Sequence, residues 1–247
     1  MWRLIYTELE NPYLNLALEE ALARRVSCNN ALPTIRIWRN QSSVILGRFQ
    51  HPLLEVDLEK CKKYNIPIVR RFTGGGTVYH DMGNINISLA IKSDFSYIKR
   101  KFIEAFAFGM QKLGLKPIIK DQRIEIDNKK ISGFASALKW HTCLVHGTIL
   151  FNTNLRMMEE LLINPKSSLR YVRSNHTSVI NLSSKVKVSL EEVLQVMILS
   201  IESTFNEKLI ERELDNEDQT LVKSLYEKKY SLPEWNLGDP FLFKEQI

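Results

Sequence analysis

The spacing of apolar residues along the chain predicts a series of helices. In 11–26, NPYLNLALEEALARRV, leucine and alanine recur every three or four positions, which is the spacing that gives a helix one buried face. The same spacing runs through 53–65, 95–114 and 189–209, and Gly114 is expected to end the helix over 95–114. A polar and weaker helix is expected at about 216–229. The last third of the chain is therefore expected to be mostly helical.

Runs of β-branched and aromatic residues predict strands between these helices. TIRIWRN and SSVILGRF are separated by a polar turn at Asn40–Gln41, IPIVRRFT leads into a glycine-rich stretch, and INISLAI alternates apolar and polar positions. RIEIDNKKISG predicts a hairpin around Asp127–Asn128, and TCLVHGTILFNT predicts one more buried strand.

The order of these elements indicates the fold class. Helices and strands alternate without a regular strand–helix–strand period, and several strands follow one another in hairpin order. The pattern therefore predicts an α/β protein of the α+β type, with a mixed, largely antiparallel sheet flanked by helices. No internal repeat, low-complexity tract or Pro/Gly-rich linker divides the chain, so residues 1–247 are expected to form a single domain.

Composition and charge narrow the range of functions. Cys28, Cys61 and Cys143 lie far apart and form no Cys-x-x-Cys pair, which is typical of a reducing compartment. The N-terminus has no apolar signal-peptide core and no run of eighteen apolar residues occurs, so we expect an intracellular, soluble protein with no membrane partner. The net charge of +6 fits an anionic substrate or an acidic protein partner. No dense basic tract with interleaved aromatics points to nucleic acid.

The stretch RRFTGGGTVYHDMGN, residues 70–84, carries the most unusual local pattern. It matches neither the GxxxxGK[ST] phosphate loop nor GxGxxG, since Tyr79 stands where the last glycine would be. Consecutive glycines let a ligand approach bare backbone N–H groups, and Arg70 and Arg71 add charge where an anion would sit. A plain glycine-rich turn beside solvated arginines explains the stretch about equally well.

A second group of residues follows the predicted hairpin. Lys130 lies on a strand near the glycine-rich stretch, where a lysine can neutralise an acyl-phosphate or polarise a carbonyl; the alternative is a solvated surface lysine. Gly147, next to His146, would leave room for a ligand tail against the sheet. His80 is either part of a site or a hydrogen-bonded structural residue. Metal-ligand spacings and a GxSxG elbow are both absent, so metal and serine hydrolases rank low.

Six blocks in this order resemble the lipoate–protein ligase / lipoyltransferase family. They are NLALEEAL, SSVILGRFQHP, RRFTGGGTVYHDMGNIN, KKISGFAS, HGTILFNTNL and VRSNHTSVINL, and the resemblance covers roughly residues 11–240. It implies a fold similar to the biotin/lipoate protein ligase catalytic domain. It also implies a reaction in which lipoate and ATP give lipoyl-AMP, whose acyl group passes to one lysine of a lipoyl domain.

The resemblance also implies residue roles and partners. Lys130 would be catalytic, contacting both the phosphate and the lipoyl carbonyl. The adenylate would be bound by Arg71, Gly74, Gly75, Gly76, Thr77, Val78, Tyr79 and Lys130. Lipoate would be bound by Arg71, Gly75, His80, Lys130, Ser132, Gly133, His146 and Gly147. Mg²⁺ would accompany ATP, with no metal ligand assigned on the protein. The expected partners are lipoyl domains of 2-oxoacid dehydrogenase E2 subunits and the glycine-cleavage H protein, in the cytoplasm, or in the mitochondrial matrix of a eukaryote.

Two departures from the family pattern bear on these expectations. The family's common Gly-Arg-Asn-Asp stretch, whose Asn-Asp pair would assist metal and nucleotide, reads Lys120-Asp121-Gln122-Arg123 here. The sequence also stops nine residues after Gly238, where many members continue into a C-terminal accessory domain. The expectation is therefore that this domain is absent and is replaced by a separate accessory chain, or that the catalytic domain works without one.

Alternative functions remain open at this point. A lipoyltransferase that uses pre-formed lipoyl-AMP would carry the same glycine stretch and lysine, and an octanoyltransferase is a related alternative. A thioester route is disfavoured, because Cys143 matches no nucleophile position. A catalytically silent binding module or a biotin–protein ligase fits less well with Lys130 and the Arg-Arg-x-Thr-Gly-Gly-Gly form.

Overall fold

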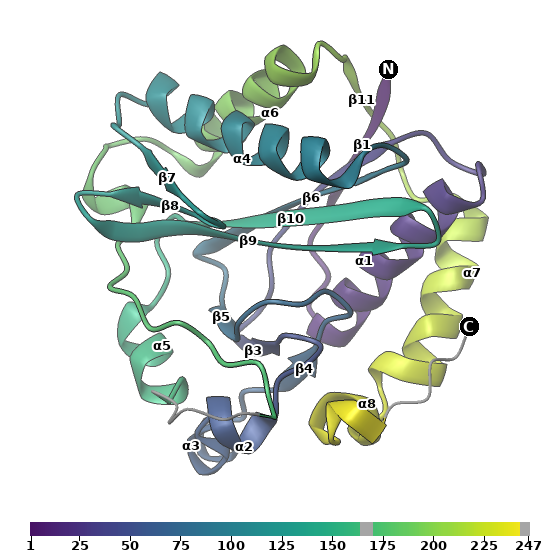
Figure 1. Ribbon diagram of the computed structural model, residues 1–247, viewed down its shortest axis with the longest axis vertical. Coiled ribbons are helices and arrows are strands. Elements are labelled where there is room, and N and C mark those ends of the chain that lie inside the picture. The colour runs from purple at the N-terminus through teal and green to yellow at the C-terminus, as the bar shows by residue number, and fades with distance from the viewer. Residues whose placement is uncertain (164–169, 243–247) are drawn as a thin grey trace.

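A large mixed sheet runs through the centre of the protein (Figure 1). The computed structural model describes residues 1–163 and 170–242, and within them the sheet has eight strands in the order β11-β1-β2-β6-β10-β9-β8-β7. They are β1 (Trp2–Thr7), β2 (Thr34–Trp38), β6 (Asn84–Ile91), β7 (Ile118–Lys120), β8 (Arg123–Ile126), β9 (Lys129–Lys139), β10 (Thr142–Leu150) and β11 (Leu209–Glu211). Strand β1 pairs in parallel with β2 and β11, and the other neighbours are antiparallel. The predicted fold class is confirmed.

Helices α4 (Phe95–Lys112) and α6 (Leu190–Phe205) cover one face of the large sheet (Figure 1). The period-two alternation of β6 explains why: Ile85, Ile87 and Leu89 point to this side and join the apolar core with α4 and α6. The opposite side of β6 carries polar side chains that are nevertheless buried, namely Asn84, Asn86 and Ser88. A buried polar face requires hydrogen-bond partners, and the candidate site lies on this side.

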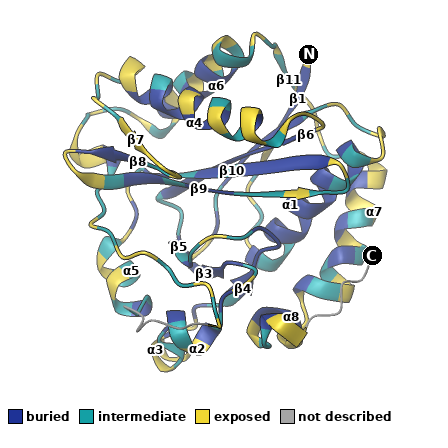
Figure 2. Cartoon of the chain, in the orientation of Figure 1, coloured by how far each residue is buried: buried dark blue, intermediate teal, exposed yellow. Residues whose placement is uncertain are grey.

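Helix α1 (Pro12–Ser27) packs against the other face of the sheet, beside α7 (Asn216–Leu225) (Figures 1 and 2). Its start follows from the sequence, because the side chain of Asn11 accepts hydrogen bonds from the backbone N–H groups of Tyr13 and Leu14, and Pro12 occupies the first turn. Most of α1 is buried, including Glu19 and Glu20, so it is enclosed on more sides than one apolar stripe predicts.

A small second sheet lies below the large one, in the order β4-β3-β5 (Figure 1). It comprises β3 (Ser43–Leu46), β4 (Ile68–Arg70) and β5 (Val78–His80), and it packs with α2 (Pro52–Glu55), α3 (Leu58–Lys63) and α5 (Leu155–Leu161). The two strands predicted on either side of Asn40–Gln41 both form, but in different sheets. The helix predicted over 53–65 is broken in two, because the Asp57 side chain accepts from the Lys60 N–H and starts a new helix.

The remaining predictions differ from the structure mainly at element ends. The helix predicted over 189–209 ends at Phe205, where Asn206 adopts a left-handed conformation at φ 54°, and the chain then forms β11. The helix expected to about 229 forms as α7 to Leu225 and continues as a π-helix over Tyr226–Tyr230, and α8 (Pro233–Leu237) follows. The predicted hairpin is confirmed, with Asp127 and Asn128 at φ 49° and 60°. Among the described residues, no helix has both the length and the apolarity needed to span a bilayer.

Candidate active site

Two cavities share a wall formed by the glycine stretch and β9. The first has a volume of about 440 Å³ and the second about 350 Å³, both within the range of small-molecule sites. Lys130 lines both, together with Thr77, Val78, Thr148, Ser174, Asn175 and Thr177. Lys130 therefore lies where the two cavities meet, and its ammonium is next to Gly133, which lines the first cavity.

The first cavity has a buried apolar end and an exposed charged end. Leu16, Trp38 and Ile45 are at most 2% exposed and, with Phe134, form the apolar wall. His80, Asn86 and His146 are among the polar side chains that line this cavity. The exposed end carries Asp121, Gln122 and Arg123.

The second cavity has a different lining. Tyr79, Leu150, Met158 and Leu162 give it an apolar wall, and Asn84, Ser132 and the segment 174–179 add polar groups. The hydroxyl of Ser132 and the side-chain oxygen of Asn84 are buried without a hydrogen-bond partner. Unpartnered buried polar atoms are costly, which suits a cavity that is completed by a polar ligand.

The three consecutive glycines differ from one another in their surroundings. Gly75 has φ 87°, a conformation that favours glycine, and a Cβ there would lie 3.0 Å from Nη2 of Arg71. At Gly76 a Cβ would lie 3.0 Å from Oγ of Ser174. Within the described residues, the N–H groups of Gly75 and Gly76 make no hydrogen bond. Gly74 lines neither cavity and faces Phe49 instead.

Arg71 lines the first cavity, but its guanidinium mainly braces the glycine stretch. Nε and Nη2 donate to the carbonyl of Gly74, Nη2 also donates to that of Gly76, and Nη1 donates to that of Ile45. Burial lowers the pKa of Arg71 to about 10, so it stays positively charged at neutral pH. It therefore supplies positive potential and loop geometry, with few N–H groups left to bind an anion.

The prediction that Arg70 also faces an anion is wrong. Arg70 is fully buried and donates to the backbone carbonyls of Gly47, Arg48 and Gln50 on one side. On the other side it donates to those of Trp235 and Gly238. It therefore joins β4 to the C-terminal segment, away from both cavities.

A β-bulge aims Lys130 into the cavities. Arg123 pairs with Gly133 and Ile124 with Ser132, whereas Glu125 pairs with Lys130, so Ile131 is an extra residue in β9. Residues three apart on a regular strand point to opposite faces, but the extra residue brings Lys130 to the face of Gly133. A Cβ on Gly133 would lie 2.8 Å from the Lys130 ammonium. The glycine therefore makes room for the lysine side chain.

A buried chain of hydrogen bonds connects α1 to the glycine stretch. Oε1 of Glu19 lies 2.8 Å from Nδ1 of His146, whose Nε2 lies 3.1 Å from Oγ1 of Thr73, and Thr73 accepts from Nε of Arg71 at 3.0 Å. Burial alone would raise the pKa of Glu19, but its contacts with His146 lower it overall. Because a carboxylate only accepts, Nδ1 of His146 donates to Glu19. This chain fixes the orientation of both His146 and Arg71.

The comparisons with known proteins agree with this geometry. Residues 11–202 match the family described as the lipoyl protein ligase A/B catalytic domain. The chain belongs to this family.

One curated relative and two solved structures are similar to this chain along almost their whole length. Lipoate-protein ligase A subunit 1 of Thermoplasma acidophilum is 34% identical over 244 residues, which cover 92% of this chain and 93% of that protein. The structure of a bi-partite lipoate protein ligase with its E2 lipoyl domain, from the same organism, superimposes with a TM-score of 0.89 at 32% identity, covering 100% of this chain and 99% of that chain. A lipoate-protein ligase A bound with ATP gives 0.86 at 33% identity, covering 96% and 99%.

Most of the site residues that the family resemblance implies do line the two cavities. The first holds Arg71, Gly75, Gly76, Thr77, Val78, His80, Lys130, Gly133, His146 and Gly147, and the second adds Tyr79 and Ser132. The expected space for a ligand at Gly147 is instead filled by aromatic rings, since a Cβ there would lie 2.5 Å from Phe134 and 2.9 Å from Phe106. Gly147 therefore serves aromatic packing under the cavity wall.

Several lining residues were missed by sequence reasoning. Trp38 and Ile45 lie in strands that read as ordinary core, and no local signal separates them from other buried positions. Ser174 belongs to the block VRSNHTSVINL, but the family resemblance implies no role for it. Its hydroxyl accepts from the Thr77 N–H at 2.8 Å and from Gln50 Nε2 at 3.0 Å. Glu19 lines neither cavity but contacts His146, which lines the first, and the two adjacent glutamates of the block NLALEEAL were the available signal for it.

The Mg²⁺ that is expected with ATP takes oxygen ligands, which carboxylates and the phosphates of the nucleotide supply. The carboxylate at the exposed end of the first cavity is Asp121, between the cations Lys120 and Arg123 in sequence. The Asp81 carboxylate accepts from the backbone N–H groups of Gly83 and Asn154. Across residues 1–163 and 170–242, no group of three or more His, Cys, Asp or Glu side chains is arranged to hold a metal ion.

The buried side chain of His80 is expected to make the stability of the protein depend on pH. Its ring is buried, Nδ1 lies 3.1 Å from Asn40 Nδ2, and burial followed by the charge of Arg71 lowers its pKa from 6.5 to about 3. Below pH 6.5 the unfolded chain binds a proton that the folded protein excludes, so stability falls as pH falls from 6.5 toward 3. We expect this group to remove about 2 kcal/mol of unfolding free energy between pH 7 and pH 5.

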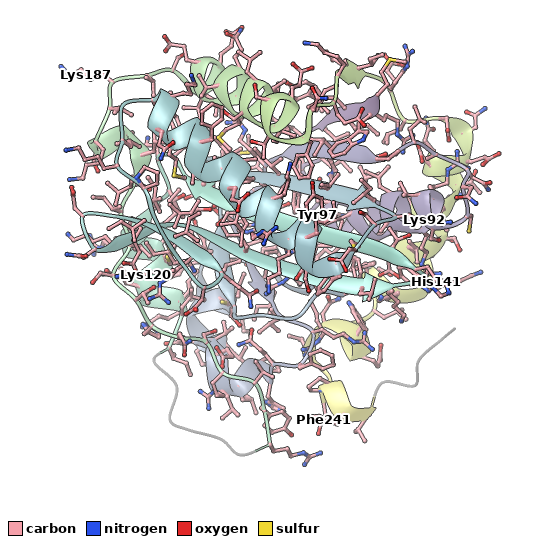
Figure 3. The ribbon with its side chains drawn as sticks, turned by 45° about the horizontal axis from the view of Figure 1, so that its top comes forward. Lys92, Tyr97, Lys120, His141, Lys187 and Phe241 are labelled. Atoms are coloured by element: carbon pink, nitrogen blue, oxygen red, sulfur yellow. The ribbon has the colours of Figure 1, made fainter. Side chains whose placement is uncertain are left out.

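Urea unfolding at several pH values measures this effect. His80→Gln is expected to show a shallower loss of stability on acidification than the wild type. His141→Asn is the control, because His141 is exposed in the turn between β9 and β10 (Figure 3) and its φ of 57° suits asparagine. Parallel pH profiles for the wild type and His80→Gln would show that His80 is not held neutral.

Proposed function

We propose that this chain activates lipoate with ATP to lipoyl-AMP and transfers the lipoyl group to a lysine of lipoyl domains. The observation that carries the proposal is the position of Lys130, which lines both cavities at their junction. An acyl-adenylate has an apolar tail, a nucleoside and one charged phosphate between them. Two cavities that meet at an ammonium group match this division.

The first cavity suits the acyl chain. Its buried end is formed by Leu16, Trp38, Ile45 and Phe134, which offer an apolar surface to a hydrocarbon tail. The indole N–H of Trp38 donates to Ser88, which donates to Glu19, so the ring is held in place. The carboxyl end of the acid would then point to Lys130.

The second cavity suits the adenosine. Tyr79, Leu150 and Met158 provide an apolar wall for a planar base, and Ser132 and Asn84 offer unpartnered polar atoms to it or to the ribose. The N–H groups of Gly75 and Gly76 and the ammonium of Lys130 then remain for the α-phosphate. Lys130, Gly75 and Gly76 would therefore bind the adenylate, as the family resemblance implies, whereas Ser132, which the resemblance assigns to lipoate, is proposed here to contact the nucleoside.

Both half-reactions place negative charge near Lys130. In the first, a lipoate carboxylate oxygen bonds to the α-phosphorus, the bond to the bridging oxygen breaks, and pyrophosphate leaves with the electron pair. In the second, the neutral acceptor amine bonds to the acyl carbon, the bond from that carbon to the phosphate oxygen breaks, AMP leaves with the electron pair, and the amine gives up a proton to solvent. Burial, then the charges of Arg123 and Arg71, lower the pKa of Lys130. A bound phosphate favours the ammonium again, so substrate binding and protonation of Lys130 are coupled.

The partners follow from the same proposal. Acceptors would be lipoyl domains of E2 subunits and the glycine-cleavage H protein. The net charge of +6 on this chain suits docking of acidic surfaces on such partners. The similar Thermoplasma acidophilum protein is described as part of a bi-partite ligase. A separate accessory chain is therefore proposed as a partner in adenylation.

Mass spectrometry of an apo lipoyl domain tests the proposal. With ATP, Mg²⁺ and lipoate, the chain, alone or with a candidate accessory chain, is expected to raise the domain's mass by one lipoyl group. Synthetic lipoyl-AMP should give the same product without ATP. If the domain is modified with lipoyl-AMP but not with ATP and lipoate, both with and without the accessory chain, the chain is a lipoyltransferase. That result would contradict the ligase function.

A further inference from the structure

Arg123 lies on the same patch of sheet as Lys130. It is the cross-strand partner of Gly133, and the Lys130 ammonium lies 2.8 Å from the position that a Cβ on Gly133 would take. Side chains of directly paired residues project from the same face about 5 Å apart. The pKa of Lys130, lowered first by burial, is lowered next by the charge of Arg123, as this proximity requires.

Arg123 is oriented from one side and open on the other. Its Nε donates to Oε1 of Glu125 at 2.7 Å, and Glu125 is held in turn by Lys120 at 2.5 Å, at the end of the sheet remote from His141 (Figure 3). Within the described part of the chain, its two terminal amino groups make no hydrogen bond. Its side chain is 28% exposed and lines the first cavity at the open end.

The other arginines that line this cavity have their donors engaged elsewhere. Arg71 donates to loop carbonyls, as described above. Arg173 donates to the Glu55 carboxylate at 2.8 Å and to the carbonyl of Leu54. A guanidinium with two terminal amino groups facing a cavity is suited to bidentate contacts with phosphate oxygens.

We propose that Arg123 binds the β- and γ-phosphates of ATP and the pyrophosphate that leaves during adenylation. The inference rests on the proposed function, in which the acyl chain fills the buried end of the first cavity. A phosphoryl displacement places the attacking and leaving oxygens roughly in line, so the leaving group departs on the side away from the carboxylate. The open end of the first cavity is on that side, and Arg123 lines it.

This role gives Arg123 a different place in the reaction from Lys130. When the bond between the α-phosphorus and the bridging oxygen breaks, pyrophosphate gains a negative charge, and the guanidinium stabilises that charge. The transfer half-reaction involves no pyrophosphate, so Arg123 has no leaving group to bind there.

Three measurements on Arg123→Gln test the inference. We expect its affinity for inorganic pyrophosphate, measured by calorimetry, to fall about tenfold, the loss typical of one hydrogen bond between charged groups. Its KM for ATP should rise by a similar factor, whereas transfer from synthetic lipoyl-AMP should change far less. Arg123→Lys, which keeps the charge but loses the fork, should lie between Arg123→Gln and the wild type in both affinities.

Arg100→Gln is the matched control. It is the same substitution at a residue of α4 whose side chain is 70% exposed. It should leave all three measurements at wild-type values. Unchanged pyrophosphate affinity in Arg123→Gln overturns the inference, and so does an equal loss in adenylation and transfer, which would indicate a structural role. If the wild type makes no lipoyl-AMP under any condition, the proposed function fails, and pyrophosphate affinity alone then decides on Arg123.

Discussion

Replacing Lys130 by alanine is expected to lower the rates of both lipoyl-AMP formation and lipoyl transfer by roughly 10²–10³-fold. Lys130 lies at the junction of the two cavities, so its ammonium is proposed to be close to the phosphate and the acyl carbonyl in both half-reactions. Among the described residues its Nζ makes no hydrogen bond, so its removal breaks no structural contact of that kind. Loss of activity without loss of stability is the expected signature.

Lys129→Ala is the control for this variant. Lys129 is the preceding residue and is exposed, so the same deletion there should change either rate by less than about twofold. Single-turnover transfer from lipoyl-AMP and lipoyl-AMP formation from ATP are to be measured separately, with thermal unfolding as a check on folding. A Lys130→Ala enzyme that keeps more than a tenth of either rate would refute the assignment of Lys130.

Gly47→Ala is expected to have the second largest effect. Gly47 follows β3, and a Cβ there would lie 2.0 Å from the carbonyl oxygen of Gly75, a backbone atom that cannot move independently of the glycine stretch. The substitution must therefore displace Gly75, whose N–H is proposed to bind the phosphate. We expect a loss of about 1–3 kcal/mol in unfolding free energy and a fall of roughly 100-fold in adenylation.

Gly74→Ala is the control. It tests whether the loss comes from the close approach of Gly47 to Gly75 or from any glycine substitution in this region. The nearest atom to a Cβ on Gly74 is Cδ2 of Phe49 at 4.0 Å, an ordinary contact, so adenylation and stability should stay near wild-type values. Both variants are to be assayed well below their midpoints of thermal unfolding. Equal losses in Gly47→Ala and Gly74→Ala would show that the close approach of Gly47 to Gly75 does not position the loop.

Much of the fold and the main catalytic candidate were accessible from the sequence. Period-two alternation predicted β6 as a strand, and the turn at Asp127–Asn128 predicted the hairpin of β8 and β9. The extra residue Ile131 was not visible, because a bulge depends on the pairing with β8 and leaves no mark on local alternation. Lys130 was therefore identified by its neighbours in sequence, and its direction follows only from the structure.

The arginines show a limit of the same kind. Arg70 and Arg71 are adjacent, equally charged and both buried, and nothing local distinguishes them. The structure separates their roles. Arg70 donates to Trp235, 165 residues further along the chain, whereas Arg71 donates to the adjacent glycine stretch. Arg123 was read as a departure from a family pattern, and its place beside Lys130 depends on the register of β8 against β9.

The central claim is that this chain forms lipoyl-AMP from lipoate and ATP at the junction of the two cavities. Lipoate-dependent exchange of labelled pyrophosphate into ATP measures that step without any lipoyl domain. We predict exchange by the chain, alone or with its accessory chain, that requires lipoate and is lost in Lys130→Ala. No exchange under either condition, from a chain that still transfers lipoyl groups from lipoyl-AMP, would contradict the claim.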